Sequence, residues 1–290
     1  MFKFSNLSKI LFGCLAVFLT SGSVFAQTSS LQNDLNNSFK KFKLAHLDTN
    51  SLARDAQARR TITIPTATGD YDLNLMPHDL RTKNYRAEET SVMGNFPLER
   101  SAVTTFKGKI SGETESEVRL TIDGAKIEGY FLKANGERFF IEPADHYSKS
   151  AQAGDFVVFA PKDSLKDHGF ECLSELEEKI ERGKEIIGSR PSATSTLRVL
   201  EIATEADYSF VSELGGAAQA NNEVLSILNM IEGSYETELG LSIDVVFQHA
   251  WTTGDPFNGS TASVILNNFR NYWNTNYPMT SVPRDLAHIW

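Results

Sequence analysis

Hydrophobic residues change their spacing along this 290-residue chain, and the change divides it into two parts. Between residues 60 and 162, short apolar runs alternate with polar residues and are separated by Gly, Asp and Asn. This spacing predicts an antiparallel sheet or sandwich. The pairs Asp123-Gly124 and Asn135-Gly136 predict hairpin turns, because both pairs tolerate a positive φ. The preceding residues 31–60 predict a polar amphipathic helix or a loosely held arm.

Longer elements follow from Leu197 onward. The runs "LRVLEIA" and "LSIDVVFQHAW" predict buried strands, and the segment between them carries apolar residues at helical spacing. Gly240 stands where a helix C-cap belongs, and Ser260 or Thr261 can cap a second helix. The final run "RDLAHIW" predicts the start of a third strand at Asp285. This order of strands and helices indicates the first part of an α/β domain with a largely parallel sheet.

The first 26 residues have the pattern of a secretory signal peptide. Lys3 and Lys9 precede the apolar run "ILFGCLAVFL" and the small-residue site "VFA", which predicts cleavage after Ala26. The apolar run is about half the roughly 20 residues that cross a bilayer, so a retained transmembrane helix is the weaker alternative. We expect a secreted or periplasmic protein. Its net charge of -9 argues against nucleic acid or an anionic membrane as partner.

Cys172 is the one cysteine that remains after signal cleavage, so the chain cannot form an internal disulfide. It is either a small buried apolar residue or a metal ligand or reactive thiol. The charged, helical run that follows it, "LSELEEKIERGKEIIG", and the polar "SRPSATST" predict a connector over residues 171–195.

The sequence from Leu197 to Trp251 resembles the first part of the catalytic domain in secreted bacterial zinc metalloproteases of the reprolysin, or adamalysin, branch of the metzincins. "FRNYWNTNY" and "RDLAHIW" resemble the next portion. "YDLNLMPHDLR", "FKGKISGETESEVRLTIDGAKIEGYFL" and "FFIEP" are similar to the propeptide of that family. The resemblance therefore spans most of the mature chain.

The resemblance implies an α+β multidomain fold. After the signal peptide at 1–26, we expect a β-rich antiparallel propeptide domain at 27–170 and the connector at 171–195. A truncated α/β metzincin-like domain, with a strand-helix-strand-helix-strand start, would occupy 196–290 and be incomplete.

The zinc motif of that family, H-E-x-x-H-x-x-G-x-x-H, is absent from the printed sequence. No two of its six histidines lie at helical i, i+4 spacing; they are His46, His78, His146, His168, His249 and His288. We therefore expect a precursor fragment whose zinc motif lies beyond Trp290. The 290 residues then hold no catalytic residue and are inactive by themselves. His249, beside an apolar strand, is expected to be a satisfied core histidine.

Two metal-binding assignments follow from the resemblance. Cys172 is a candidate inhibitory zinc ligand, a cysteine switch, because a soft thiolate suits zinc. Glu201 and Asp285 match positions that hold a structural calcium in the family, and carboxylate oxygens suit calcium. The alternatives are a packed thiol at Cys172 and an exposed strand position at Glu201.

Two functions remain open. The first is the precursor of a zinc metalloendopeptidase that hydrolyses protein or peptide substrates and whose propeptide binds its own catalytic domain. The second is a noncatalytic secreted binding protein with a degenerate protease remnant. Neither function involves nucleic acid, or a membrane once the signal is cleaved.

Overall fold

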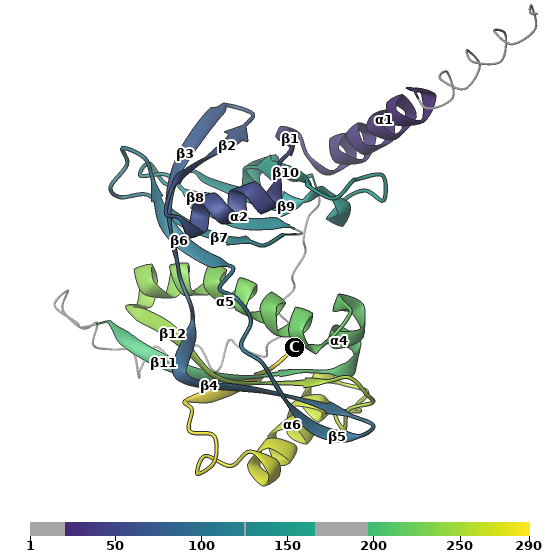
Figure 1. Cartoon of the computed structure of the whole chain (residues 1–290), viewed down its shortest axis with the longest axis vertical. Coiled ribbons are helices and arrows are strands. Elements are labelled where there is room, and N and C mark those ends of the chain that lie inside the picture. Colours follow the sequence, from purple (N-terminus) through teal and green to yellow (C-terminus); the bar gives the residue numbers. More distant parts are fainter. Residues whose placement is uncertain (1–20, 125, 166–196) are drawn as a thin grey trace, which may run out of the picture.

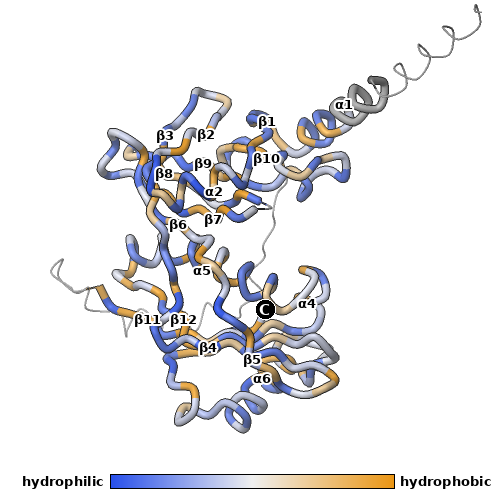
Figure 2. The backbone as a smooth tube through the Cα atoms, viewed as in Figure 1, coloured by the Kyte–Doolittle hydropathy of each residue, from blue (hydrophilic) through white to orange (hydrophobic). Residues whose placement is uncertain are grey.

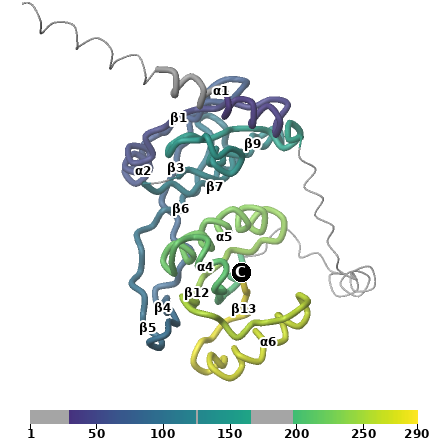
Figure 3. Tube along the Cα trace, turned by 90° about the vertical axis from the view of Figure 1, so that its right-hand side faces the viewer, coloured from purple at the N-terminus to yellow at the C-terminus, as the bar shows by residue number. Residues whose placement is uncertain are grey.

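The computed structural model describes residues 21–124, 126–165 and 197–290, with the side chains of residues 21–29 outside that description. Its elements lie in stacked layers (Figure 1). An eight-stranded sheet lies on one side of helix α5 (Ala217–Leu239), and a five-stranded sheet lies on the other. Helix α6 (Ala262–Asn276) covers the far face of the five-stranded sheet. The view turned by 90° shows the same order of layers (Figure 3).

The eight-stranded sheet is antiparallel throughout, in the order β1-β10-β9-β8-β7-β6-β3-β2. Its last strand, β2, approaches β1 and β10, so the sheet is nearly closed. The strands are β1 (Phe42–His46), β2 (Thr61–Thr66), β3 (Gly69–Pro77), β6 (Thr105–Ile110), β7 (Glu117–Ile122), β8 (Ile127–Leu132), β9 (Arg138–Pro143) and β10 (Asp155–Phe159).

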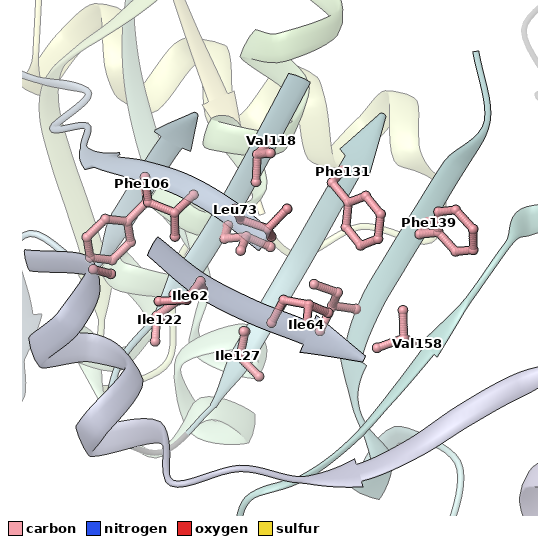
Figure 4. Close-up of a cluster of buried hydrophobic side chains, with 14 of the residues drawn as sticks. Ile62, Ile64, Leu73, Phe106, Val118, Ile122, Ile127, Phe131, Phe139 and Val158 are labelled. Atoms are coloured by element: carbon pink, nitrogen blue, oxygen red, sulfur yellow. The ribbon is translucent and has the colours of Figure 1, made fainter. Parts of the chain in front are cut away.

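A hydrophobic core fills the concave side of this sheet (Figure 4). Alternate residues of each strand point into it, as the sequence spacing predicts; Leu73 and Leu75 of β3 are examples. The predicted hairpin turns are confirmed. Asp123 closes the β7–β8 connection through its N–H to the carbonyl of Lys126 at 3.1 Å, and Gly136 between β8 and β9 has φ +85°.

Residues 31–60 are part of this unit, and the prediction of a loosely held arm is wrong. Helix α1 (Ser21–Ser38) is followed by β1, which pairs with β10. Helix α2 (Thr49–Gln57) begins at Asp48, whose carboxylate accepts hydrogen bonds from two backbone N–H groups of the first turn. Two short 3₁₀ turns, Ala144–His146 and Pro161–Asp163, flank β10.

The five-stranded sheet has the order β13-β11-β12-β4-β5 and takes strands from both ends of the chain. All neighbours are parallel except β4 and β5. The strands are β4 (Arg81–Ser91), β5 (Gly94–Leu98), β11 (Arg198–Ala206), β12 (Leu241–Trp251) and β13 (Leu286–Ile289). The hairpin β4–β5 thus leaves the eight-stranded unit and extends this sheet beside β12.

Helices cover both faces of the five-stranded sheet, and the caps predicted from the sequence are present. As predicted, Gly240 ends α5 with φ +63°, and Thr261 caps α6. Asp207 caps a further short helix, α4 (Tyr208–Leu214). The apolar positions predicted on α5 pack against the sheet in one buried cluster. Both hydrophobic and hydrophilic positions lie along α5 (Figure 2). No described helix is both long enough and apolar enough to span a membrane.

The predicted fold class is wrong. The described chain is mostly β, and its largest unit is a nearly closed eight-stranded antiparallel sheet rather than the start of an α+β multidomain metzincin. Periodicity reports which face of a strand is buried, but not which sheet the strand joins. The burial pattern of β4 has no regular alternation, and its local sequence does not indicate that it pairs with β12 and β5 rather than with β3.

Candidate functional site

The two residues predicted to hold calcium are hydrogen-bonded to each other through the backbone of Glu201. Asp285 donates its N–H to the carbonyl of Glu201 at 2.8 Å, and its Oδ2 accepts the N–H of Glu201 at 2.8 Å. The pair therefore joins the middle of β11 to the start of β13, and both residues are exposed. Calcium takes six to eight oxygen ligands. The structure brings the two predicted residues together, and the calcium assignment stays a prediction.

The other metal-binding assignment, Cys172, lies outside the described residues, as does His168. Each remaining histidine has a local partner. His46 and His146 bind neighbouring carboxylates, at Asp155 and Glu142, and His288 stacks on Trp290. Within residues 21–124, 126–165 and 197–290, no three His, Cys, Asp or Glu side chains converge on a point where they could hold a metal. These residues do not fit a zinc centre.

A buried carboxylate, Glu205 near the end of β11, organises the α6 side of the five-stranded sheet. Its Oε1 accepts hydrogen bonds from His249 Nδ1 at 2.6 Å and from Trp251 Nε1 at 2.5 Å. Its Oε2 accepts one from Trp273 Nε1 at 2.5 Å. Glu205 and His249 are fully buried. The carboxylate is thus held by side chains of β12 and α6, and all three of these donors point at it.

The second nitrogen of His249 reaches β4. Its Nε2 lies 2.8 Å from Thr90 Oγ1, and that hydroxyl donates to Asn95 Oδ1 at 2.8 Å. The imidazole of His249 therefore links Glu205 of β11 to Thr90 of β4. Burial raises the pKa of Glu205, and the hydrogen bonds from His249, Trp273 and Trp251 oppose that rise.

Because Glu205 and His249 have no exposed surface, they cannot meet a substrate in this structure. Their role is to join the end of β4, from the N-terminal part of the chain, to β11, β12 and α6. The expectation that His249 is a satisfied core histidine is confirmed. The carboxylate partner was missed, because Glu205 and His249 are 44 residues apart and nothing in the sequence pairs them.

A second ionic cluster lies between α5 and the eight-stranded sheet. Arg119 of β7 donates from Nη1 to Glu232 Oε2 at 2.6 Å and from Nη2 to the carboxylate of Glu236. Its Nε lies 3.3 Å from Glu117 Oε1. His78, just after β3, also binds Glu232. The side chains of Arg119 and Glu232 are 2% and 1% exposed, so this is a buried ion cluster.

The protonation of this cluster follows from its geometry. Burial acts to raise the pKa of Glu232, but the hydrogen bond and charge of His78, the N–H of Ile243 and the charge of Arg119 outweigh it and lower the pKa to about 2. Burial lowers the pKa of Arg119, whereas Glu232 and Glu236 raise it, with a net rise. Both partners are therefore ionised at neutral pH.

A smaller group of ions continues the same contact. Lys126 binds Glu223 of α5 and lies 2.6 Å from Glu128 Oε1 of β8. Ser226 of α5 donates to Glu128 at 2.5 Å, and Asn229 donates to the carbonyls of two strands. The sequence carries a signal for this surface, since these polar α5 residues recur every three or four positions opposite the apolar face.

Comparison with known proteins assigns no family to this chain. Neither a protein-family model nor a curated protein sequence matches the chain. Among solved structures, the chain is similar to metalloproteinase-II from Bacteroides fragilis, at 9% sequence identity and a TM-score of 0.37. The similarity covers 80% of this chain and 64% of that one, so the chain spans less than two thirds of its length. At that TM-score the similarity assigns neither a family nor an activity.

Proposed function

We propose that this chain is the precursor portion of a secreted zinc-dependent metalloendopeptidase, similar to the reprolysin branch of the metzincins. Residues 27–170 would act as the prosegment of the region that begins at residue 196. The sequence resemblance on both sides of the connector supports this proposal. The predicted signal peptide supports export of the precursor.

The observation that carries the proposal is the way the two parts of the chain are joined. Strand β4, from the proposed prosegment, is the second parallel neighbour of β12, beside β11 on the other side. Parallel strands need partners and cover on both sides. Residues 27–170 thus complete the five-stranded sheet of the region that begins at residue 196, and they also cover α5. These are the contacts expected of a prosegment that assists the folding of its own chain.

Zinc would be held by sequence that follows Trp290, because the described residues do not fit it. Cys172 would bind that zinc as a thiolate in the precursor and keep it latent. Glu201 and Asp285 would contribute two carboxylates to a structural calcium site.

The test compares two proteins. The gene product that carries the zinc motif should cleave casein once its prosegment is removed, and a chelator should abolish that cleavage. Purified residues 27–290 should cleave no casein above blank and retain no stoichiometric zinc after dialysis. Chelator-sensitive proteolysis by residues 27–290 would refute the proposal.

The noncatalytic secreted binding protein is the alternative outcome of the same test. It is favoured if the gene product has no zinc motif, since the described residues bring no three metal-binding side chains together.

Two variants of the gene product test the metal assignments. Cys172→Ser should be active before prosegment removal, and a variant as latent as the wild type removes the inhibitory role of that thiol. Calcium should raise the melting temperature of the wild type but not of Asp285→Ala, because ligand that binds only the folded state stabilises it.

A further inference from the structure

Helix α5 presents opposite chemistries on its two faces. Val224, Leu225 and Leu228 pack into a buried hydrophobic cluster with the five-stranded sheet. The polar face of α5, turned toward the eight-stranded sheet, consists of Glu223, Ser226, Asn229, Glu232 and Glu236.

The apposed strands are polar as well, since Glu117 and Arg119 of β7 and Glu128 of β8 point at α5. Among the described residues, no buried hydrophobic cluster combines α5 with the eight-stranded sheet. The contact is held by charges and hydrogen bonds. Separating the two layers would therefore expose little apolar surface.

The chain crosses between the layers at few points. In its described part, only residues 78–80 and 99–104 connect the eight-stranded sheet to the hairpin β4–β5. That hairpin is built into the five-stranded sheet and does not have to move with the eight-stranded unit. The two connections can act as hinges, because a hinge needs only a few residues at the ends of elements.

We propose that the ion cluster between α5 and the eight-stranded sheet is an acid-sensitive clasp, which holds the two layers together at neutral pH and lets them hinge apart as the pH falls. The proposal rests on the proposed precursor function for its role, which is to loosen the prosegment from the region it covers.

The groups around Glu232 define the clasp. Arg119 faces it from β7 and His78 from the end of β3. The N–H of Ile243 donates to its Oε1 at 2.9 Å from β12, where Asp244 is a further nearby carboxyl.

The other clasp groups surround Glu236 and Lys126. Lys107 of β6 lies 3.5 Å from Glu236 Oε1, and Glu236 also binds Arg119. Lys126 binds Glu223 and Glu128. Carboxylates therefore outnumber the lysine and arginine side chains, and protonating them removes the charges that balance the cations.

Acid acts most strongly on Arg119. Protonating Glu232 leaves the guanidinium of Arg119, which is 2% exposed, without a full countercharge. A buried charge without a countercharge is costly. Because the pKa of Glu232 is lowered in the closed state, its carboxylate stabilises that state at pH values above its ordinary pKa of 4.5. This stabilisation is lost as the pH falls toward 2. Between pH 7 and pH 3, Glu232 alone favours opening by at most about 30-fold, because the N–H of Ile243 stays bound to it after opening.

The experiment measures the radius of gyration of residues 27–290 by small-angle X-ray scattering, with far-UV circular dichroism as a check on secondary structure. Between pH 7 and pH 3, we expect the radius to increase while the dichroism is retained. An unchanged radius at pH 3 would overturn the proposal. So would a radius that rises only together with loss of the dichroism, because that is unfolding rather than opening.

Two variants sharpen the test. Arg119→Met leaves Glu117, Glu232 and Glu236 facing one another without the guanidinium, so it should open at pH 7 and close on acidification, the reverse of the wild type. A variant that responds to pH as the wild type does would refute the clasp.

Gly233→Ala tests the contact without changing charge. An added Cβ would lie 2.0 Å from Glu117 Oε1 and 2.1 Å from the hydroxyl of Tyr130, both on the eight-stranded sheet. Both atoms are ends of side chains that must move aside, which displaces Glu117 from Arg119, while alanine favours the helix itself. The variant should therefore open at a higher pH than the wild type, with α5 intact. Leu239→Ala, at an exposed position of the same helix, also changes no charge; it is the matched control and should open at the wild-type pH. A Gly233→Ala protein that opens at the wild-type pH contradicts the proposal. None of these readouts depends on proteolysis, so failure of the clasp and failure of the precursor function are separable.

Discussion

Replacing Glu205 by glutamine should destabilise the folded chain more than the same replacement of an exposed glutamate does. The carboxylate uses both oxygens, Oε1 for His249 and Trp251 and Oε2 for Trp273. A glutamine amide keeps one acceptor oxygen and places an NH₂ group where the other oxygen was. If the oxygen faces His249 and Trp251, the NH₂ faces the N–H of Trp273, and two donors meet without an acceptor.

The expected cost follows from burial. Removing an acceptor from buried donors costs about 1 to 3 kcal/mol for each donor left unsatisfied, because that donor keeps its desolvation penalty, so we expect a loss of about 3 kcal/mol. Glu205 and His249 are both fully buried, so no exposed surface relieves that penalty. For a chain of this size, each kcal/mol shifts the melting temperature by roughly 2 to 4 °C, so we expect a fall of about 10 °C.

The assay is urea unfolding of residues 27–290, followed by tryptophan fluorescence, with a thermal melt as the second measurement. Trp251 and Trp273 donate to the replaced carboxylate and report on its surroundings. Glu213→Gln is the matched control, because Glu213 is exposed and lies on α4, a helix of the same layer. We expect the control to change stability by less than about 0.5 kcal/mol. A loss below about 1 kcal/mol for Glu205→Gln would show that the buried pair does not hold β4, β11, β12 and α6 together.

Three further predictions concern stability and use the same unfolding assay. Because the pKa of Glu232 is lowered to about 2, this residue alone should reduce the free energy of unfolding of the wild type by about 3 kcal/mol as the pH drops from 4.5 toward 2. Glu232→Gln should show a shallower fall over that range, and an equal slope would contradict the lowered pKa of Glu232. Gly240→Ala should cost about 1 kcal/mol, because Gly240 ends α5 with φ +63°; an unchanged midpoint would mean that the cap is not needed. Gly108→Ala should cost at least about 2 kcal/mol, because the new Cβ would lie 2.1 Å from the carbonyl oxygen of Asn74, and a neutral result would show that β3 and β6 can move apart.

The sequence by itself determined the local elements. Period-2 spacing and turn pairs predicted the strands of the eight-stranded sheet that lie between residues 60 and 162, but not β1. The predicted caps at Gly240 and Thr261 marked helix ends correctly. These signals are readable because each depends on residues a few positions apart, whose interaction is fixed by backbone geometry. The adjacency of Glu201 and Asp285 was also predicted, through the resemblance rather than through spacing.

Only the tertiary structure decided how these elements combine. Sequence spacing gave no indication that β4 and β5 join the other sheet, because a strand carries no mark of its partner. The same holds for Glu205 with His249 and for Arg119 with Glu232, which are 44 and 113 residues apart. A buried charge needs a countercharge, but which residue supplies it depends on how the chain folds over long distances, and no local pattern encodes that choice.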